Sequence, residues 1–202
     1  MLRIGNKTKT TNKIAIKYCL TVFYIVFSIL FFADSVYAQT PKIQAITVDD
    51  GLSQGLVYDI IQSRDGFMWM ATPAGLNRYD GQRFKVYTND PFDPFSIASN
   101  DVLQLFEDSR GWIWCKLPEG IDIFDPKRQR FFHLPLKVHN VYTTKFTFAE
   151  LSDGTVLILN NNNLWRIKLY LEVLENAVKS GNAALDLPCE QITRQLPGGA
   201  AK

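Results

Sequence analysis

The sequence predicts an all-β fold, a partial β-propeller of about three four-stranded blades followed by a short C-terminal helix. Two observations carry this prediction. Residues 56–80 recur as residues 101–125 without a gap, and turn residues divide each copy into four short strands. With 47% hydrophobic and 21% charged residues, the composition is typical of a folded chain rather than a disordered one.

The first 38 residues predict a secretory signal peptide. Arg3, Lys7, Lys9, Lys13 and Lys17 precede an apolar stretch of 16 residues, Tyr18 to Ala33, which is followed by small or β-branched residues at the cleavage positions. We expect cleavage after Ala38. The alternative is an uncleaved membrane anchor, but the apolar stretch is shorter than the roughly 20 residues that span a bilayer. Cys19 lies inside the stretch and not at its end, which argues against lipoprotein attachment.

Charge and cysteine usage narrow the functional classes. Removal of residues 1–38 changes the net charge from +2 to −2, so the sequence carries no basic patch for nucleic acid. The three cysteines have no zinc-type spacing and are too few for a disulfide-stapled domain. We expect Cys115 and Cys189 to be unpaired. The sequence has only two histidines, too few to favour a His-based metal site or a catalytic triad. The composition therefore favours a binding module over an enzyme.

The two copies of the repeat have identical residues at several positions. Six pairs are identical between the two copies: Val57/Val102, Gly66/Gly111, Trp69/Trp114, Pro73/Pro118, Gly75/Gly120 and Asp80/Asp125. After a two-residue slip, Gln82-Arg83-Phe84 recurs as Gln129-Arg130-Phe131. A weaker third copy starts near Phe146, where Ser152-Asp153-Gly154 matches the turn and Leu157 stands in place of the repeated tryptophan.

Turn signals divide each copy into strands. In the first copy we expect strands at 56–62, 67–72, 75–79 and 83–87, separated by Asp65-Gly66, Pro73-Ala74-Gly75 and Asp80-Gly81. The strands run apolar for several residues, as expected where both faces of a sheet are covered. A four-stranded unit of this size covers both faces by stacking radially against its neighbours, which is the architecture of a propeller blade.

The chain after the signal peptide holds two good blades and one degenerate one, whereas propellers close with about four to eight blades. We therefore expect the sequence to be a fragment of a longer protein. The predicted parts are a signal peptide (1–38), an N-terminal strand and propeller opening (39–55), blade 1 (56–100), blade 2 (101–144), a degenerate blade 3 (145–169) and a truncated helical or irregular tail (170–202). Within this tail, apolar residues at helical spacing predict a helix over about 169–187.

The repeat resembles a known family. The opening Ile46 to Gln54, followed by Val57-Tyr58-Asp59-Ile60-Ile61, is similar to the start of the two-component regulator propeller. The segments 65–72 and 75–81 resemble the same family. The resemblance is good over about residues 44–134 and loose over 145–167.

The resemblance implies a function. In that family the blades form the extracytoplasmic sensor of hybrid two-component histidine kinases, and relatives commonly detect polysaccharide breakdown products. It implies a periplasmic domain in an inner-membrane protein, a small-molecule or oligosaccharide ligand, downstream domains in the same chain and a homodimer in the full-length form. The kinase domains themselves are absent from the sequence, and neither His133 nor His139 is expected to be phosphorylated. We therefore expect no catalytic residue, cofactor or metal, and the ligand-binding residues stay unassigned.

Three groups of side chains invite a functional interpretation. One group is aromatic and resembles a sugar-binding platform: Phe67, Trp69, Tyr79, Trp112 and Trp114. Trp69 and Trp114 occupy the same position of the repeat, however, which indicates packing between blades. The turn-flanking aspartates are interpreted as turn caps, because no calcium-loop pattern surrounds them: Asp49, Asp50, Asp59, Asp65, Asp80, Asp93, Asp101 and Asp108. Glu107, Glu119 and Glu150 are expected at the surface. Loop 88–100, the longest blade connection, is a candidate ligand-reading segment.

The favoured function is therefore an extracytoplasmic, ligand-sensing propeller fragment of a hybrid two-component sensor. Ligand binding would shift the packing or pairing of propellers. Two alternatives stay open: a secreted propeller module that closes by oligomerising, and a propeller lyase or hydrolase that acts on extracellular polymers.

Overall fold

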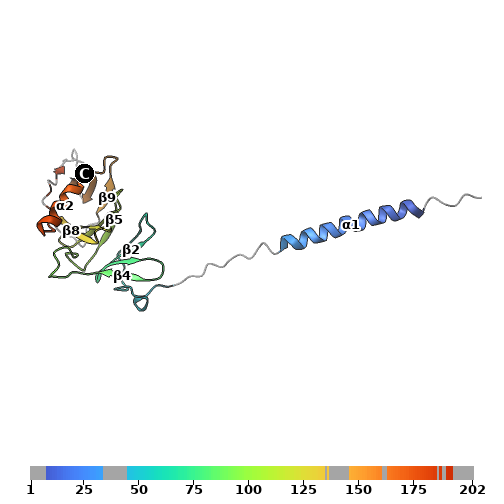
Figure 1. Cartoon of the computed structure of the whole chain (residues 1–202), viewed down its shortest axis with the longest axis horizontal. Helices are drawn as coiled ribbons and strands as arrows, with labels where there is room; N and C mark the ends of the chain where they lie inside the picture. The colour runs from blue at the N-terminus through green and yellow to red at the C-terminus, as the bar shows by residue number, and fades with distance from the viewer. Residues whose placement is uncertain are drawn as a thin grey trace, which may run out of the picture. The chain divides into compact units, whose positions relative to one another are not determined.

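The computed structural model describes residues 8–33, 45–134, 136, 146–160, 163–185, 187 and 190–192. The chain separates into two compact units, Met1–Ala45 and Ile46–Lys202. The first unit contains α1 (Thr8–Ala33), which includes the apolar stretch predicted within the signal peptide (Figure 1). Within the described ranges, no helix has the length and apolar character needed to cross a membrane. The predicted cleavage site at Ala38 lies outside the described residues.

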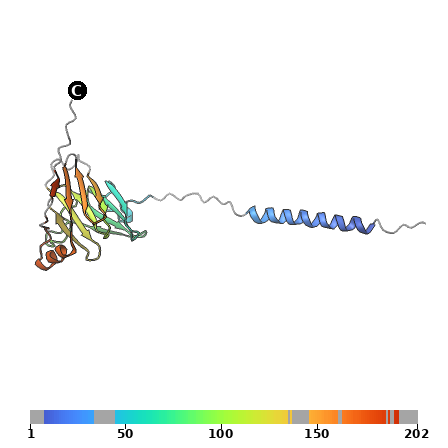
Figure 2. The same ribbon diagram turned by 90° about the horizontal axis from the view of Figure 1, so that it is seen from above.

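The second unit contains three antiparallel sheets of four strands each (Figures 1 and 2). A short 3-10 helix, η1 (Val48–Asp50), precedes them. The strands of the first sheet are β1 (Asp59–Gln62), β2 (Met68–Thr72), β3 (Gly75–Tyr79) and β4 (Phe84–Tyr87). Those of the second are β5 (Gln104–Glu107), β6 (Ile113–Leu117), β7 (Gly120–Asp125) and β8 (Arg130–Leu134). Those of the third are β9 (Thr147–Glu150), β10 (Val156–Asn160), β11 (Asn163–Ile167) and β12 (Glu190–Ile192). The predicted fold class, three four-stranded units and a short helix, is confirmed.

The register of the first two sheets repeats with the sequence. Trp69 on β2 lies opposite Ile61 and Arg78, and Trp114 on β6 lies opposite Phe106 and Ile123, at the same ladder positions. The predicted strands of the first copy agree with the structure to within a few residues. Turn glycines explain this accuracy, because Gly66 and Gly111 have positive φ and close the first hairpin of each sheet.

The third sheet takes its fourth strand from the predicted tail. β12 pairs with β11 through Leu164 opposite Ile192, after the intervening helix α2 (Leu171–Ser180). β12 (Glu190–Ile192) is too short to show an alternating apolar pattern, so the sequence does not predict it as a strand. Only its pairing with β11 makes it one. α2 is shorter than the predicted helix because Gly181 adopts a left-handed conformation and caps its C-terminus.

Two apolar layers join the sheets. Between the first and second sheets, Trp69 and Leu76 pack with Ile113, Phe124 and Phe131. A second layer joins the second sheet to the third and to α2. It includes Trp114, Ile123, Phe132, Phe146, Val156, Ile158, Trp165 and Leu174.

The middle sheet alone is covered on both faces within the described residues. Every residue of β6 is buried, as expected for a strand that runs apolar, whereas β1 alternates between half-buried and exposed. Ile60 and Val86, which lie on the uncovered face of the first sheet, are 52% and 38% exposed. Leu159 on the third sheet is 43% exposed. The described part therefore has two apolar faces without a neighbouring sheet.

Candidate functional site

A pocket of about 470 Å³ lies at one end of the second sheet. The β4–β5 connection and the β6–β7 turn form its rim, and β7, β8 and the segment after α2 form its walls. The lining residues are Ala98, Ser99, Asp101, Leu117, Pro118, Glu119, Gly120, Ile121, Asp122, His133, Leu134 and Ala184. The volume lies within the roughly 300–1,000 Å³ of small-molecule sites.

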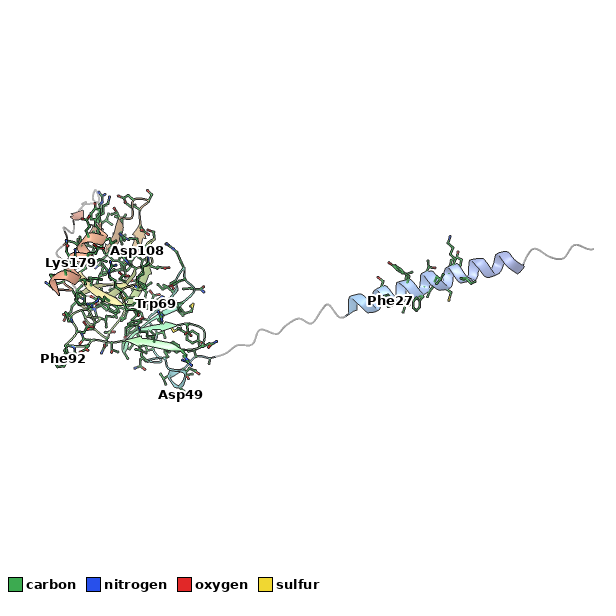
Figure 3. The ribbon with its side chains drawn as sticks, in the orientation of Figure 1. Phe27, Asp49, Trp69, Phe92, Asp108 and Lys179 are labelled. Carbon is green, nitrogen blue, oxygen red and sulfur yellow. The ribbon has the colours of Figure 1, made fainter. Side chains whose placement is uncertain are left out.

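The predicted ligand-reading loop 88–100 contributes to this pocket through its last residues. Phe95 and Ile97 are buried, and the Asn89 side-chain amide donates to the carbonyl of Ile97, so this half of the loop is anchored to the sheet. Ala98 and Ser99 then line the pocket. Phe92, at the outer end of the loop, is 96% exposed and points away from the sheets (Figure 3).

Asp122 and His133 anchor the loop to the pocket wall. Asp122 Oδ2 accepts a hydrogen bond from the backbone N–H of Ala98 at 2.7 Å, and Asp122 Oδ1 lies 2.8 Å from His133 Nδ1. His133 Nε2 lies 2.9 Å from the carbonyl oxygen of Pro94. A carbonyl only accepts, so Nε2 donates. The doubly protonated imidazolium satisfies both the carboxylate and the carbonyl.

The protonation of this pair follows from its surroundings. Burial acts to lower the pKa of His133, but the hydrogen bond and charge of Asp122 and the bond to Pro94 outweigh it and raise the pKa above its usual 6.5. Burial also raises the pKa of the Asp122 carboxyl, against the opposing effects of His133 and the Ala98 N–H. The favoured state is an imidazolium that bridges β7 and loop 88–100.

His133 also connects the second sheet to the segment after α2. Its backbone N–H donates to the carbonyl of Ala183, and its carbonyl accepts from the N–H of Leu185. Ala184, between them, lines the pocket. The outer strand β8 is thus bonded to the segment that links α2 to β12 of the third sheet. α2 lies beside β8 in both ribbon views (Figures 1 and 2).

The pocket carries an excess of negative charge. Asp122 is paired with His133, whereas Asp101 and Glu119 form no ion pair in the described part of the chain. Asp101 Oδ1 is buried without a hydrogen-bond partner. No lysine or arginine is among the described lining residues. Asp101, which was predicted to cap a turn like the other aspartates, differs from them in this buried, unbonded oxygen.

The first sheet repeats the loop anchor without the histidine. Asn77 Oδ1 accepts from the backbone N–H of Ser53 at 2.9 Å, at the positions equivalent to Asp122 and Ala98. Leu52, equivalent to Ile97, is buried in the same way. The same anchor therefore recurs in the segments that precede β1 and β5. Asn77 and Asp122 occupy equivalent positions of the two aligned copies, so the sequence repeat pairs them.

The repeated tryptophans pack between sheets, as interpreted. Trp69 and Trp114 are 1% and 0% exposed, and their Nε1–H groups donate to Ser63 Oγ and Asp108 Oδ2. The remaining aromatic residues of that set do not line the 470 Å³ pocket either. Arg110 stacks on Trp112 and Arg78 stacks on Phe67, while Tyr79 stacks on Phe84. Trp112 borders a smaller pocket of about 270 Å³ at the opposite turns of the sheets.

Several of the aspartates cap turns, which confirms their interpretation. Asp80, Asp93 and Asp108 accept from backbone N–H groups two to four residues further along the chain. Asp59 has a second role, because its Oδ2 accepts from the N–H of Leu105 in the next sheet. Among the described residues, no group of three or more potential ligands is arranged to hold a metal ion.

The glutamates differ from one another. Glu119 is exposed, as expected, and stands at the rim of the pocket. Glu107 and Glu150 are half-buried and join neighbouring sheets: Glu107 accepts from the N–H of Arg64 at 3.1 Å, and Glu150 from the N–H of Ser109 at 2.6 Å. Both lie at the surface, as expected, and each also holds the turn of the preceding sheet through hydrogen bonds to its backbone.

Cys115 is free and fully buried. Burial and the charge of Asp122 raise the pKa of its thiol, so it is an apolar core residue and not a nucleophile. Cys189 and His139 lie outside the described residues.

Comparison with known proteins agrees with the repeat geometry. Residues 51–74 match the family described as the two component regulator propeller. The resemblance found in the sequence is confirmed. Over 78 residues the chain is 44% identical to a protein named histidine kinase P4 from Formosa agariphila, which covers 36% of this chain and 6% of that protein. The chain thus carries propeller repeats related to those of two-component sensors.

Two solved structures show a similar arrangement of strands. The extracellular domain assigned to the hybrid two-component system BT3049 of B. thetaiotaomicron aligns with a TM-score of 0.47 and 24% identity, over 63% of this chain and 18% of that one. Virginiamycin B lyase from Staphylococcus aureus aligns with a TM-score of 0.47 and 14% identity, over 69% and 41%. At these values neither likeness bears on function. The chain spans a small part of the proteins it matches.

Proposed function

We propose that the chain is the ligand-sensing, extracytoplasmic propeller region of a hybrid two-component sensor, exported by residues 1–38, and that it binds its ligand in the pocket of about 470 Å³. The observation that carries this proposal is the convergence of three separate segments on one pocket. These are the β4–β5 connection, the β6–β7 turn and the segment after α2. The match to the two component regulator propeller and to a small part of a histidine kinase supports a signalling role for this region.

The pocket is built so that a ligand contacts parts of the chain that are otherwise far apart. Ser99 and Asp101 belong to the connection between two sheets, Glu119 to a hairpin turn, and Ala184 to an insertion of the third sheet. A ligand that touches all three favours one arrangement of these segments over others. In a sensor, the change in the arrangement of these segments on ligand binding is transmitted to downstream domains of a longer, dimeric chain.

We propose a small molecule derived from a polysaccharide as the ligand. Carbonyls, carboxylates and the Ser99 hydroxyl of the lining accept hydrogen bonds from sugar hydroxyls, and Ala98, Pro118 and Ala184 offer apolar surface to the faces of a ring. The lyase or hydrolase alternative lacks comparable support. The Asp122 carboxylate is already engaged by His133 and by the N–H of Ala98.

Filling the pocket tests the proposal. Ala184 is exposed and lines the pocket, so Ala184→Trp places an indole in it, whereas Asn176→Trp places one on the exposed face of α2. Oligosaccharides from digested polysaccharides are screened by the rise in thermal midpoint that a bound ligand causes. We expect the rise to vanish in Ala184→Trp and persist in Asn176→Trp. A rise retained in both variants places the ligand elsewhere and overturns the proposed site.

A further inference from the structure

The charge of the pocket limits the ligands that it accepts. Its charged lining groups are the carboxylates of Asp101, Glu119 and Asp122 and the ring of His133. The His133 imidazolium balances Asp122, to which it is bonded at 2.8 Å. Asp101 and Glu119 therefore contribute two negative charges that no other described lining residue compensates.

The hydrogen-bonding capacity of the pocket is also one-sided. Asp101 Oδ1 is buried without a donor among the described residues, which is costly for a carboxylate oxygen, while the rest of this half-buried side chain lines the pocket. Two backbone donors of the loop are already used, because the Ala98 N–H binds Asp122 and the Asp101 N–H binds Ser99 Oγ. The pocket offers acceptors and lacks a free cationic donor among its described lining residues.

From these observations we infer that the pocket selects a ligand that carries a positively charged amine and rejects ligands that carry carboxylate or sulfate groups. The inference rests on the ligand-binding function proposed above and names the chemical class of its ligand. An amine donates to the carboxylates of Asp101 and Glu119 and offsets their charge, whereas an anionic ligand meets like charges and finds no lysine or arginine among the described lining residues. Among saccharides, the class is amino sugars with a free amine.

Three disaccharides of similar size separate the effect of charge from that of shape. Chitobiose carries protonated amines, N,N′-diacetylchitobiose is its neutral counterpart, and digalacturonate carries carboxylates. Binding to the purified chain is measured by calorimetry at pH 6 and low salt, and ¹⁵N–¹H spectra locate the site through the amides of Ala98 and Gly120. We expect chitobiose to bind roughly ten-fold more tightly than digalacturonate, the sum of two partly exposed charge pairs.

Charge-neutralising variants test the residues. Asp101→Asn and Glu119→Gln are each expected to weaken chitobiose binding roughly two- to five-fold and to leave the neutral disaccharide unaffected. Asp49→Asn removes the same charge from the exposed helix η1, which does not line the pocket, and is expected to change nothing. Unaltered thermal midpoints verify that the variants fold.

The outcomes separate this inference from the function on which it rests. Digalacturonate bound in the pocket as tightly as chitobiose overturns the charge selectivity and leaves the ligand site in place. Chitobiose binding that is insensitive to both pocket variants overturns the roles of Asp101 and Glu119. If none of the three sugars perturbs the amides of Ala98 and Gly120, the saccharide site itself is refuted.

Discussion

His133 joins three segments of the described chain. It pairs with Asp122, binds the carbonyl of Pro94, and holds the segment at Ala183 and Leu185 through its backbone. Protonation of its ring therefore affects the loop at Pro94 and the pocket wall at Asp122 together.

The raised pKa of His133 makes stability depend on pH. A group whose pKa is higher in the folded state stabilises the fold below its unfolded value, near 6.5, and loses this contribution as pH rises through the folded value. We expect thermal stability to fall as pH rises above 6.5. His133→Gln should lack this component and cost about 1 kcal/mol at pH 6, since the ring is partly exposed. Melting curves of both proteins from pH 6 to 9 check this, and parallel curves contradict it.

The two repeated tryptophans allow a matched comparison of their hydrogen bonds. Trp114 donates to the buried carboxylate of Asp108, whereas Trp69 donates to the hydroxyl of Ser63. Trp114→Phe and Trp69→Phe remove similar volumes, but the first leaves a charged acceptor short of a donor. We expect Trp114→Phe to lower the free energy of unfolding by about 1 kcal/mol more than Trp69→Phe. Equal losses in chemical denaturation would show that packing alone matters.

At the scale of elements, tight hairpins set the geometry of each sheet. Gly75 opens β3 with φ of 121°, and a Cβ there would lie 2.5 Å from the carbonyl oxygen of Tyr87 on β4. Gly81 has φ of 95° but open space around it. A residue with a side chain would be strained by the positive φ at either position, but only at Gly75 would its Cβ also clash with the neighbouring strand.

Alanine at these glycines separates the two effects. Gly81→Ala is expected to cost about 1 kcal/mol from the left-handed backbone alone. Gly75→Ala adds the backbone clash, which forces β3 and β4 apart, so we expect a loss of more than about 3 kcal/mol. Urea unfolding monitored by tryptophan fluorescence measures both values. A Gly75→Ala loss no greater than that of Gly81→Ala would refute the clash.

The clamps between sheets are a second repeated element. Glu107 binds the turn at Arg64, and Glu150 binds the turn at Ser109. Glu107→Ala should speed hydrogen exchange at the Arg64 amide and leave the Ser109 amide protected, and Glu150→Ala should do the reverse. Exchange that rises at both turns in either variant would indicate general destabilisation in place of two local clamps.

At the scale of the whole second unit, the apolar outer faces dominate the expected behaviour. Ile60 and Val86 are exposed on a sheet face that packs against no other sheet in the described residues. Burying such a face is favourable by about 25 cal/mol per Å² of apolar area, so we expect the chain to self-associate.

Charges on the uncovered face should suppress this association. The double variant Ile60→Glu with Val86→Glu places two carboxylates on the face, whereas Gln82→Glu with Asn176→Glu adds the same charge at exposed positions elsewhere. We expect sedimentation velocity to show less association for the first variant only. Equal reduction in both would assign the effect to net charge.

The sequence by itself determined the repeat, its strands and the packing role of the tryptophans. These features depend on local patterns: a fixed spacing of 45 residues, glycine where the turn requires positive φ, and apolar runs where both faces of a sheet are covered. The same local character made α2 predictable, and the turn glycines placed the strands of the first copy to within a few residues.

Only the tertiary structure decided where the repeat closes and which residues form the pocket. β12 has no period of its own and exists through pairing with β11, and Asp101, Glu119 and His133 come together because three connections meet at one sheet end. Glu107 and Glu150 looked like surface residues because their partners are backbone amides in the preceding sheet. Contacts between distant segments depend on chain geometry, which residue spacing alone does not encode.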